Sequence, residues 1–125
     1  MAALHARTLL IAQIETVEGL GNVEAIAAVP GIDVLWLGHF DLTNSLGIPG
    51  AFDHPDYIAA VARIVAACDR AGKVAAFLAT DERSARDAVA RGFRMFAYGI
   101  DQLMLQDALR AGLAMLRSVP PEERR

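Results

Sequence analysis

Cysteine, aromatic residues and long hydrophobic runs are all scarce in this chain of 125 residues. A single cysteine, Cys68, excludes an internal disulfide and a cysteine-rich zinc site. No uninterrupted stretch of about 18 apolar residues occurs, so we expect no membrane-spanning segment. The opening MAALHAR lacks the apolar core of a signal peptide. Together these features favour a reducing environment, and we predict a cytoplasmic location.

Basic charge is also in short supply. The chain has 12 Lys and Arg against 15 Asp and Glu, which gives a net charge of −3 at pH 7. Domains that bind nucleic acids carry clustered positive charge, so the composition argues against a nucleic-acid partner. The hydrophobic share of 54% is enough to fill a core. We therefore predict one domain over residues 1–125, with frayed ends at 1–8 and 118–125.

Short apolar runs alternate along the chain with longer segments of helical periodicity. The runs cover residues 9–15, 33–38, 74–79 and 95–99. Unbroken apolar strands of this length are typical of a parallel sheet with both faces covered. The segments between and after them, at 17–26, 55–72, 80–92 and 103–116, space their apolar residues as amphipathic helices do. Local signals support these helices, because Pro55 suits a first helical position, Gly72 a helix end, and Thr80 or Asp81 a cap.

The order of elements predicts an α/β fold of four βα units with parallel strands and right-handed crossovers. A complete (β/α)₈ TIM barrel needs eight such units and about 250 residues. The chain therefore corresponds either to half of such a barrel or to a small open sheet. Both arrangements leave strand edges unpaired, which favours association with a second copy or with a missing half.

Two carboxylates follow neighbouring strands at the edge where α/β folds bind ligands. Glu15 ends the first apolar run, and Asp41 follows the second. Adjacent parallel strands lie about 4.8 Å apart, so the two carboxylates would repel unless a cation or a proton lay between them. Mg²⁺ and Mn²⁺ are commonly held by such oxygen ligands. The pattern also allows Glu15 to be an acid at a helix N-terminus and Asp41 to be a helix or turn cap.

The segment 38–53 is unusually long for a βα connection and is rich in glycine and proline. Long loops in compact βα units tend to be functional, and the backbone N–H groups of this loop could hold a carboxylate. An ordinary surface loop is the alternative. His39 could act as an acid–base group or be a packed, hydrogen-bonded histidine. His54 is interpreted as a helix cap, and Cys68 as a small buried hydrophobic residue.

Much of the chain resembles a known enzyme family. The two segments that carry the resemblance read QIETVEGLGNVEAIAAVPGIDVLWLGHFDLTNSLGIPG and HPDYIAAVARIVAACDRAGKVAAFLATDERSARDAVARGFRMFAYGID. They resemble the HpcH/HpaI aldolase family, which contains 4-hydroxy-2-oxoheptanedioate aldolase and 2-keto-3-deoxy-L-rhamnonate aldolase. QIET is a specific marker only in combination with the later GHFDLTN, LG and HP. The resemblance extends from about Leu9 into the last predicted helix.

The resemblance implies a fold and a reaction. Members of the family are class II aldolases, which are (β/α)₈ barrels that cleave 4-hydroxy-2-oxo acids to pyruvate and an aldehyde. This chain would be the C-terminal half of such a barrel, with a divalent metal (Mg²⁺ or Mn²⁺, with Co²⁺ as a further candidate). The metal would stabilise the enolate of pyruvate. Its partners would be a 2-oxo acid and an aldehyde.

The resemblance also implies roles for individual residues. Glu15 and Asp41 match the two protein ligands of the metal. Gln13 matches a polar residue that lines the pyruvate site, and Leu78 matches an apolar residue near the aldehyde pocket. The backbone at Phe40 and Asp41 matches the place that holds the pyruvate carboxylate, and Gly38 is expected among the substrate-binding residues.

Two features depart from the family pattern. The family usually has Pro-Ala before the aspartate, where this chain has His39 and Phe40. The family's arginine for the keto oxygen and its acid–base histidine belong to the N-terminal half of the barrel, which no part of this chain matches. His39 is therefore the nearby candidate for a catalytic base.

Two other functions stay open. A carbon–carbon lyase acting on CoA esters, of the citrate lyase β type, also uses Glu and Asp on a barrel. A basic CoA-binding patch would favour that enzyme, and the sequence shows none. The other alternative is a non-catalytic half-barrel that binds metal and oxo acid.

Overall fold

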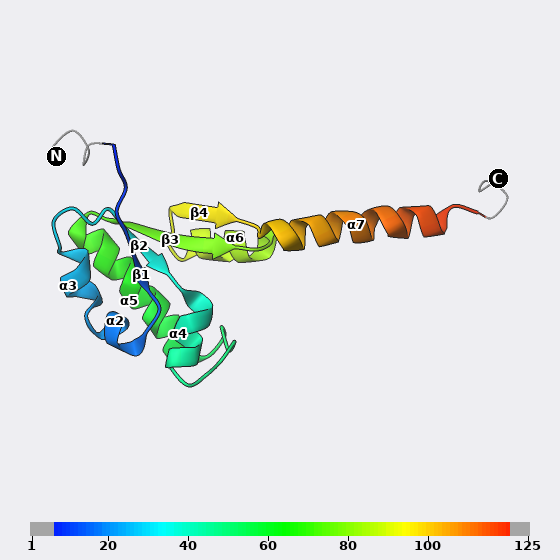
Figure 1. The fold of residues 1–125 in the computed structure, drawn as a ribbon. Coiled ribbons are helices and arrows are strands. Elements are labelled where there is room, and N and C mark those ends of the chain that lie inside the picture. Colours follow the sequence, from blue (N-terminus) through cyan, green and yellow to red (C-terminus); the bar gives the residue numbers. More distant parts are fainter. Residues whose placement is uncertain (1–6, 121–125) are drawn as a thin grey trace.

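The computed structural model describes residues 7–120 as a layer of strands with helices on one side and a long last helix that extends away (Figure 1). The elements are β1 (Ile11–Ile14), α2 (Val17–Gly21), α3 (Val23–Ala27), β2 (Val34–Leu37), α4 (His39–Ser45), α5 (Pro55–Ala71), β3 (Val74–Ala79), α6 (Glu82–Ala90), β4 (Met95–Tyr98) and α7 (Asp101–Ser118). Four parallel strands follow the chain order β1-β2-β3-β4, which confirms the predicted α/β fold.

Both chain ends were predicted to fray, and that prediction is largely untested. Residues 1–6 and 121–125 lie outside the described part of the chain. None of the helices within 7–120 combines the length and the hydrophobicity that crossing a bilayer requires.

The strand register separates the sheet into two different faces. Gln13 pairs with Trp36, so both side chains lie on one face, and neither is buried. Ile14 pairs with Leu37 on the opposite face, where both are almost completely buried beneath α5. The hydrophobic core therefore lies between the sheet and the helices. On the Gln13 face, Val34 and Ala76 are buried, whereas Gln13 and Trp36 are not.

Helix α5 begins and ends at the predicted signals. Pro55 is its first residue, and the Nδ1 atom of His54 accepts a hydrogen bond from the Asp56 N–H at 3.2 Å. Gly72 ends the helix with a φ of 64°, a left-handed conformation that glycine adopts without steric cost. The cap interpretation of His54 is thus confirmed, and Cys68 is buried as predicted.

Two connections differ from the sequence prediction. The segment 17–26 is two short helices that meet at Asn22, whose side-chain amide donates to the Glu18 carbonyl at 2.9 Å instead of capping α3. Residues 38–53, predicted to be a loop, begin with the helix α4.

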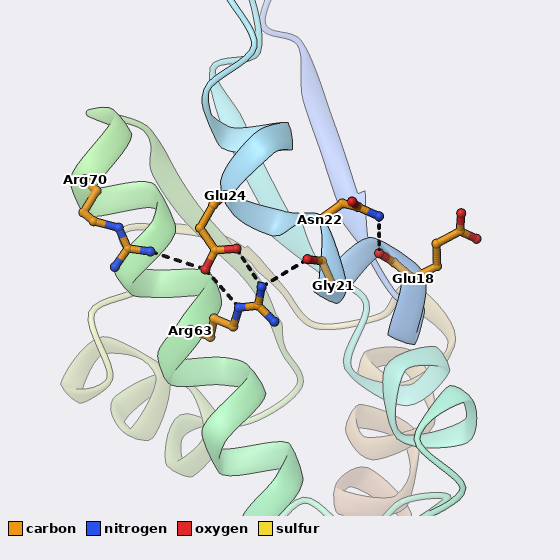
Figure 2. Close-up of polar contacts among 6 residues, drawn as sticks. All are labelled: Glu18, Gly21, Asn22, Glu24, Arg63 and Arg70. Atoms are coloured by element: carbon orange, nitrogen blue, oxygen red, sulfur yellow. Dashed lines mark hydrogen bonds and ion pairs between the residues drawn. The ribbon is translucent and has the colours of Figure 1, made fainter.

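An arginine on α5 clamps these short helices to the body of the molecule (Figure 2). Arg63 donates to both carboxylate oxygens of Glu24, from Nε at 2.9 Å and from Nη2 at 2.7 Å. Nη2 also donates to the Gly21 carbonyl at 3.1 Å, and Arg70 lies 3.4 Å from Glu24. The hydrogen bonds from Arg63 lower the pKa of Glu24 to about 2. This clamp fixes the N-terminal βα connection against α5.

Helix α7 has no buried residue in the described structure. It projects from the end of β4 away from the other helices (Figure 1). Its exposed large apolar side chains are Leu103, Met104, Leu105, Leu109, Leu113, Met115 and Leu116. The sequence predicts this helix, but its position apart from the core was not predicted.

Candidate functional site

Three of the predicted site residues meet where β1 and β2 end. The amide of Gln13 donates from Nε2 to Oε2 of Glu15 at 2.6 Å. Gly38 follows β2, and its N–H donates to the Ile14 carbonyl at 3.0 Å, which continues the strand pairing by one residue. The Glu15 and Gln13 side chains thereby lie directly over the Gly38 backbone.

Glycine is required at position 38 by this close approach. A Cβ atom there would lie 2.6 Å from the Glu15 Cβ, 2.9 Å from the Gln13 Nε2 and 3.2 Å from the Glu15 Oε2. Distances below 3.0 Å are not tolerated by carbon atoms, so any side chain would displace the carboxylate. The absence of a side chain at Gly38 is therefore what gives Glu15 its position.

Asp41 lies in the first turn of α4, one turn from the same glycine. Gly38 occupies the N-cap position, and its carbonyl accepts the Leu42 N–H at 2.8 Å. The first N–H groups of a helix have no partner within the helix and point towards the N-terminal end. The first turn therefore places Asp41 and the first N–H groups of α4 next to the end of β2.

Two hydroxyl residues that the sequence reasoning missed hold α4 in place. Thr43 is fully buried, and its Oγ1 donates to the Phe40 carbonyl at 2.7 Å and accepts the Gly50 N–H at 3.0 Å. Ser45 accepts the Val17 N–H through Oγ at 2.9 Å, which joins α4 to the start of α2. The run DLTNS contains these hydroxyls, but nothing local to it identifies their partners.

The carboxylate oxygens of Glu15 and Asp41 are donors that suit a hard divalent cation with few protein ligands. Neither Glu15 nor Asp41 forms an ion pair with a basic residue within the described residues. No group of three or more His, Cys, Asp or Glu that could hold a metal occurs in that part of the chain. Zinc sites usually take three or four such ligands, whereas Mg²⁺ is often held by one or two carboxylates plus water and substrate.

His39 lies in an aromatic cluster on the helix-covered side of the sheet. Its ring centroid is 4.6 Å from that of Phe40, 5.5 Å from that of Phe52 and 5.0 Å from that of Phe77. Phe77 is on the face opposite Ala76 and Trp36, so the imidazole packs away from the Gln13 face. Burial lowers the pKa of His39, and the ring is neutral at pH 7. This environment is the packed histidine that the sequence left as an alternative to an acid–base group.

The remaining predicted residues lie at the margins of the site. Phe40 is 55% exposed, and its backbone is in the first turn of α4 beside Asp41. Leu78 pairs with Ala97 of β4 and is half-buried. The structure thus brings Gln13 and Glu15 together over the β2 end and places His39 on the other side of the sheet.

The sequence of this chain is similar to those of known aldolases and lyases. The model of the family HpcH/HpaI aldolase/citrate lyase matches residues 3–108. A hydroxypyruvate/pyruvate aldolase of Paraburkholderia phytofirmans is 44% identical over 114 residues, which is 91% of this chain and 44% of that protein. A 2-keto-3-deoxy-L-rhamnonate aldolase of Salmonella typhimurium is 39% identical over 123 residues, covering 95% of this chain and 45% of that one.

Solved structures share the fold. A crystal structure of an HpcH/HpaI aldolase/citrate lyase family protein from Burkholderia cenocepacia superposes with a TM-score of 0.85 at 39% identity. The match covers 90% of this chain and 44% of that one. The chain therefore spans about half the length of the relatives it matches, and its four βα units correspond to half of their barrel.

Proposed function

The chain belongs to the HpcH/HpaI aldolase/citrate lyase family, and on that premise we propose that it provides the metal- and pyruvate-binding half of a class II aldolase. The reaction would cleave a 4-hydroxy-2-oxo acid to pyruvate and an aldehyde. The observation that carries the proposal is the Glu15 carboxylate. It is held by Gln13 over a position where only glycine fits, and it has no cationic partner among the described residues.

Glu15 and Asp41 would hold the metal, and Mg²⁺ or Mn²⁺ fits their oxygen donors better than zinc does. When bound, the cation supplies a Lewis acid that polarises the keto group of pyruvate. A citrate lyase β subunit from M. tuberculosis is known in complex with oxaloacetate and magnesium. That protein is 24% identical with a TM-score of 0.61, so the likeness concerns the fold, and the donor set carries the metal proposal.

The chain's own groups would orient the oxo acid. Gln13 fixes the Glu15 carboxylate through Nε2, and its second amide hydrogen stays available to a ligand. The first-turn N–H groups at Phe40 and Asp41 would donate to the pyruvate carboxylate. Thr43 and Ser45 keep these donors in place through their hydrogen bonds to Gly50 and Val17.

The reaction also needs a general base, a group that accepts a proton. A neutral imidazole such as that of His39 can accept a proton, and His39 is the candidate within this chain. Its packing against Phe52 and Phe77 instead supports a structural role. We propose that the base is supplied by the half of the barrel that this chain does not span.

Association is part of the proposed function. The apolar side chains along α7 are exposed, and β1 and β4 are the edges of the sheet in the described residues. Exposed apolar helix faces and unpaired strand edges are features that proteins usually cover. We propose that a second copy or the missing half of the barrel covers them.

A second candidate function rests on the length of the chain. Because it covers 44% of the hydroxypyruvate/pyruvate aldolase that it resembles, it could bind metal and oxo acid without cleaving a carbon–carbon bond. The two functions differ in product release and not in binding.

Calorimetry with Mn²⁺ and then pyruvate tests the assignment, and Glu15→Gln and Asp41→Asn are the informative variants. We expect each to weaken Mn²⁺ binding by tenfold or more, on the order of 1.4 kcal/mol. Glu18→Gln is the matched control, because Glu18 is an exposed acid in the first turn of α2. Equal Mn²⁺ affinity in all three variants would refute the assignment of Glu15 and Asp41 as metal ligands.

Product release separates the aldolase from the binding module. Pyruvate formed from a 4-hydroxy-2-oxo acid is measured with Mn²⁺ or Mg²⁺ and again with EDTA. Metal-dependent release of pyruvate by this chain would support the aldolase function and would indicate that His39 is the general base. Binding of metal and pyruvate without release would support the non-catalytic alternative.

A further inference from the structure

A cavity of about 160 Å³ lies on the helix-covered side of the sheet, separate from the Gln13–Glu15 pair. It lies between the carboxyl ends of β2 and β3 and the helices α5 and α6. Leu37, Val61 and Ala88 form part of its wall, and all three are buried core residues. Of the candidate site residues, His39 and Leu78 line it, whereas the proposed metal ligands Glu15 and Asp41 and the neighbouring Gln13 do not.

Aromatic rings dominate the lining of this cavity. His39 contacts Phe52 at 5.5 Å and Phe77 at 5.0 Å, measured between ring centroids. Phe77 in turn lies 5.3 Å from Phe93, and Phe52 lies 5.4 Å from Tyr57. The five rings come from different elements and form a continuous surface against which a flat molecule would pack.

The charged groups at this cavity cancel each other. Arg91 and Asp87 both line it, and the Arg91 Nε lies 2.7 Å from the Asp87 Oδ2. No unpaired charge therefore favours an ionic ligand, and a charged molecule would lose its hydration without compensation.

The hydroxyls of Tyr57 and Thr80, both in the lining, are candidates to recognise a polar atom inside the cavity. Tyr57 is 6% exposed, and burial raises its pKa to about 12, so the phenol keeps its proton at neutral pH and can donate it. The Ser84 hydroxyl also lines the cavity, but it already donates to the Asp81 carbonyl at 2.9 Å within the α6 capping box. A ligand would therefore meet aromatic walls and the hydroxyl groups of Tyr57 and Thr80.

We propose that this cavity binds a small neutral aromatic molecule with one oxygen acceptor, of about the size of phenol, with the acceptor facing the Tyr57 hydroxyl. The volume is suitable, because an apolar cavity of roughly 150 Å³ in another protein admits benzene. The walls supply ring contacts and the tyrosine supplies orientation, a combination typical of small-molecule sites.

The test is a titration of the full chain with phenol, followed by calorimetry and by amide chemical shifts, without metal or pyruvate. Leaving these out makes the result independent of the proposed function. We expect saturable binding of one phenol per chain, with shifts concentrated in α6 and around Phe93. Benzoate, which has the same ring with a negative charge, is expected to bind at least tenfold more weakly. Absence of saturation, or equal affinity for benzoate, would overturn the proposal.

Two variants locate the binding. Ala88→Leu places a larger side chain in the cavity and is expected to abolish phenol binding, whereas Ala62→Leu on the exposed side of α5 is its control. Tyr57→Phe keeps the ring and removes the donor, so it should weaken phenol at least threefold while leaving toluene unchanged. If Ala88→Leu does not fold, the phenol affinity of Tyr57→Phe tests the proposal. Unchanged phenol affinity in Tyr57→Phe would refute the proposed orientation.

Discussion

Replacing Gly38 by alanine tests the central geometry of the site. The new methyl carbon would lie 2.6 Å from the Glu15 Cβ and 2.9 Å from the Gln13 Nε2, so β1 or the Glu15 side chain has to move. Overpacking of this kind costs about 1–3 kcal/mol. Gly38 has a φ of −83°, which alanine tolerates. Alanine also lowers the conformational entropy of the unfolded chain, which stabilises the folded state by about 0.4–1 kcal/mol and offsets part of the overpacking cost.

The net expectation for Gly38→Ala is a loss of up to about 2.6 kcal/mol in the free energy of unfolding. A tenfold or larger loss of Mn²⁺ affinity should accompany it, because Glu15 is displaced. Urea unfolding followed by circular dichroism measures the loss of stability, as a shift in the urea midpoint at constant slope. Calorimetry measures the Mn²⁺ affinity.

Gly21→Ala is the matched control for this experiment. A Cβ atom at Gly21 meets nothing within 4 Å, and the residue lies in α2, where alanine is the better helix former. We expect unchanged Mn²⁺ affinity and unchanged or slightly higher stability. If Gly38→Ala unfolds at the same urea concentration as Gly21→Ala and binds Mn²⁺ as tightly, the close contact above Gly38 is not what positions Glu15.

Three further predictions concern other parts of the molecule. Since the folded-state pKa of Glu24 is lowered to about 2 from 4.5, its contribution to stability is present above pH 4.5 and is lost as the pH falls towards 2. Urea midpoints measured across this interval should fall less steeply in Glu24→Gln than in the parent, and parallel curves would contradict the clamp by Arg63. Cys68 is buried and burial raises its pKa, so it should react slowly with a thiol reagent until urea is added, and an equal rate in both conditions would refute its burial. Ultraviolet titration should show that Tyr57 ionises near pH 12, and loss of its proton near pH 10 would show that its hydroxyl is hydrated.

Those parts of the fold that depend on local signals were predictable from the sequence. The four apolar runs became strands because their residues suit a covered parallel sheet. The ends of α5 were predictable because His54 and Gly72 act within one turn of the helix. The same holds for Asp81, which accepts the Ser84 N–H at 2.7 Å.

Features that depend on distant contacts were not predictable. Helix α4 begins a segment with the composition of a loop. It is held by hydrogen bonds from the Gly50 N–H to the Thr43 hydroxyl and from the Val17 N–H to the Ser45 hydroxyl. The sequence also could not decide the environment of His39, because Phe77 reaches it only through the packing of β3 beside β2. The family resemblance predicted the candidate residues, whereas the contact of Gln13 and Glu15 above Gly38 required the structure.

The simple strand order has a consequence for how the chain would be made. Each strand pairs only with its immediate predecessor and successor in the described sequence, from β1 to β4. A chain emerging from the ribosome could therefore add one βα unit at a time to a sheet that already exists, as repeat proteins extend an ordered array. No strand has to wait for a partner from the distant end of the segment, which keeps loop-closure entropy low at every step.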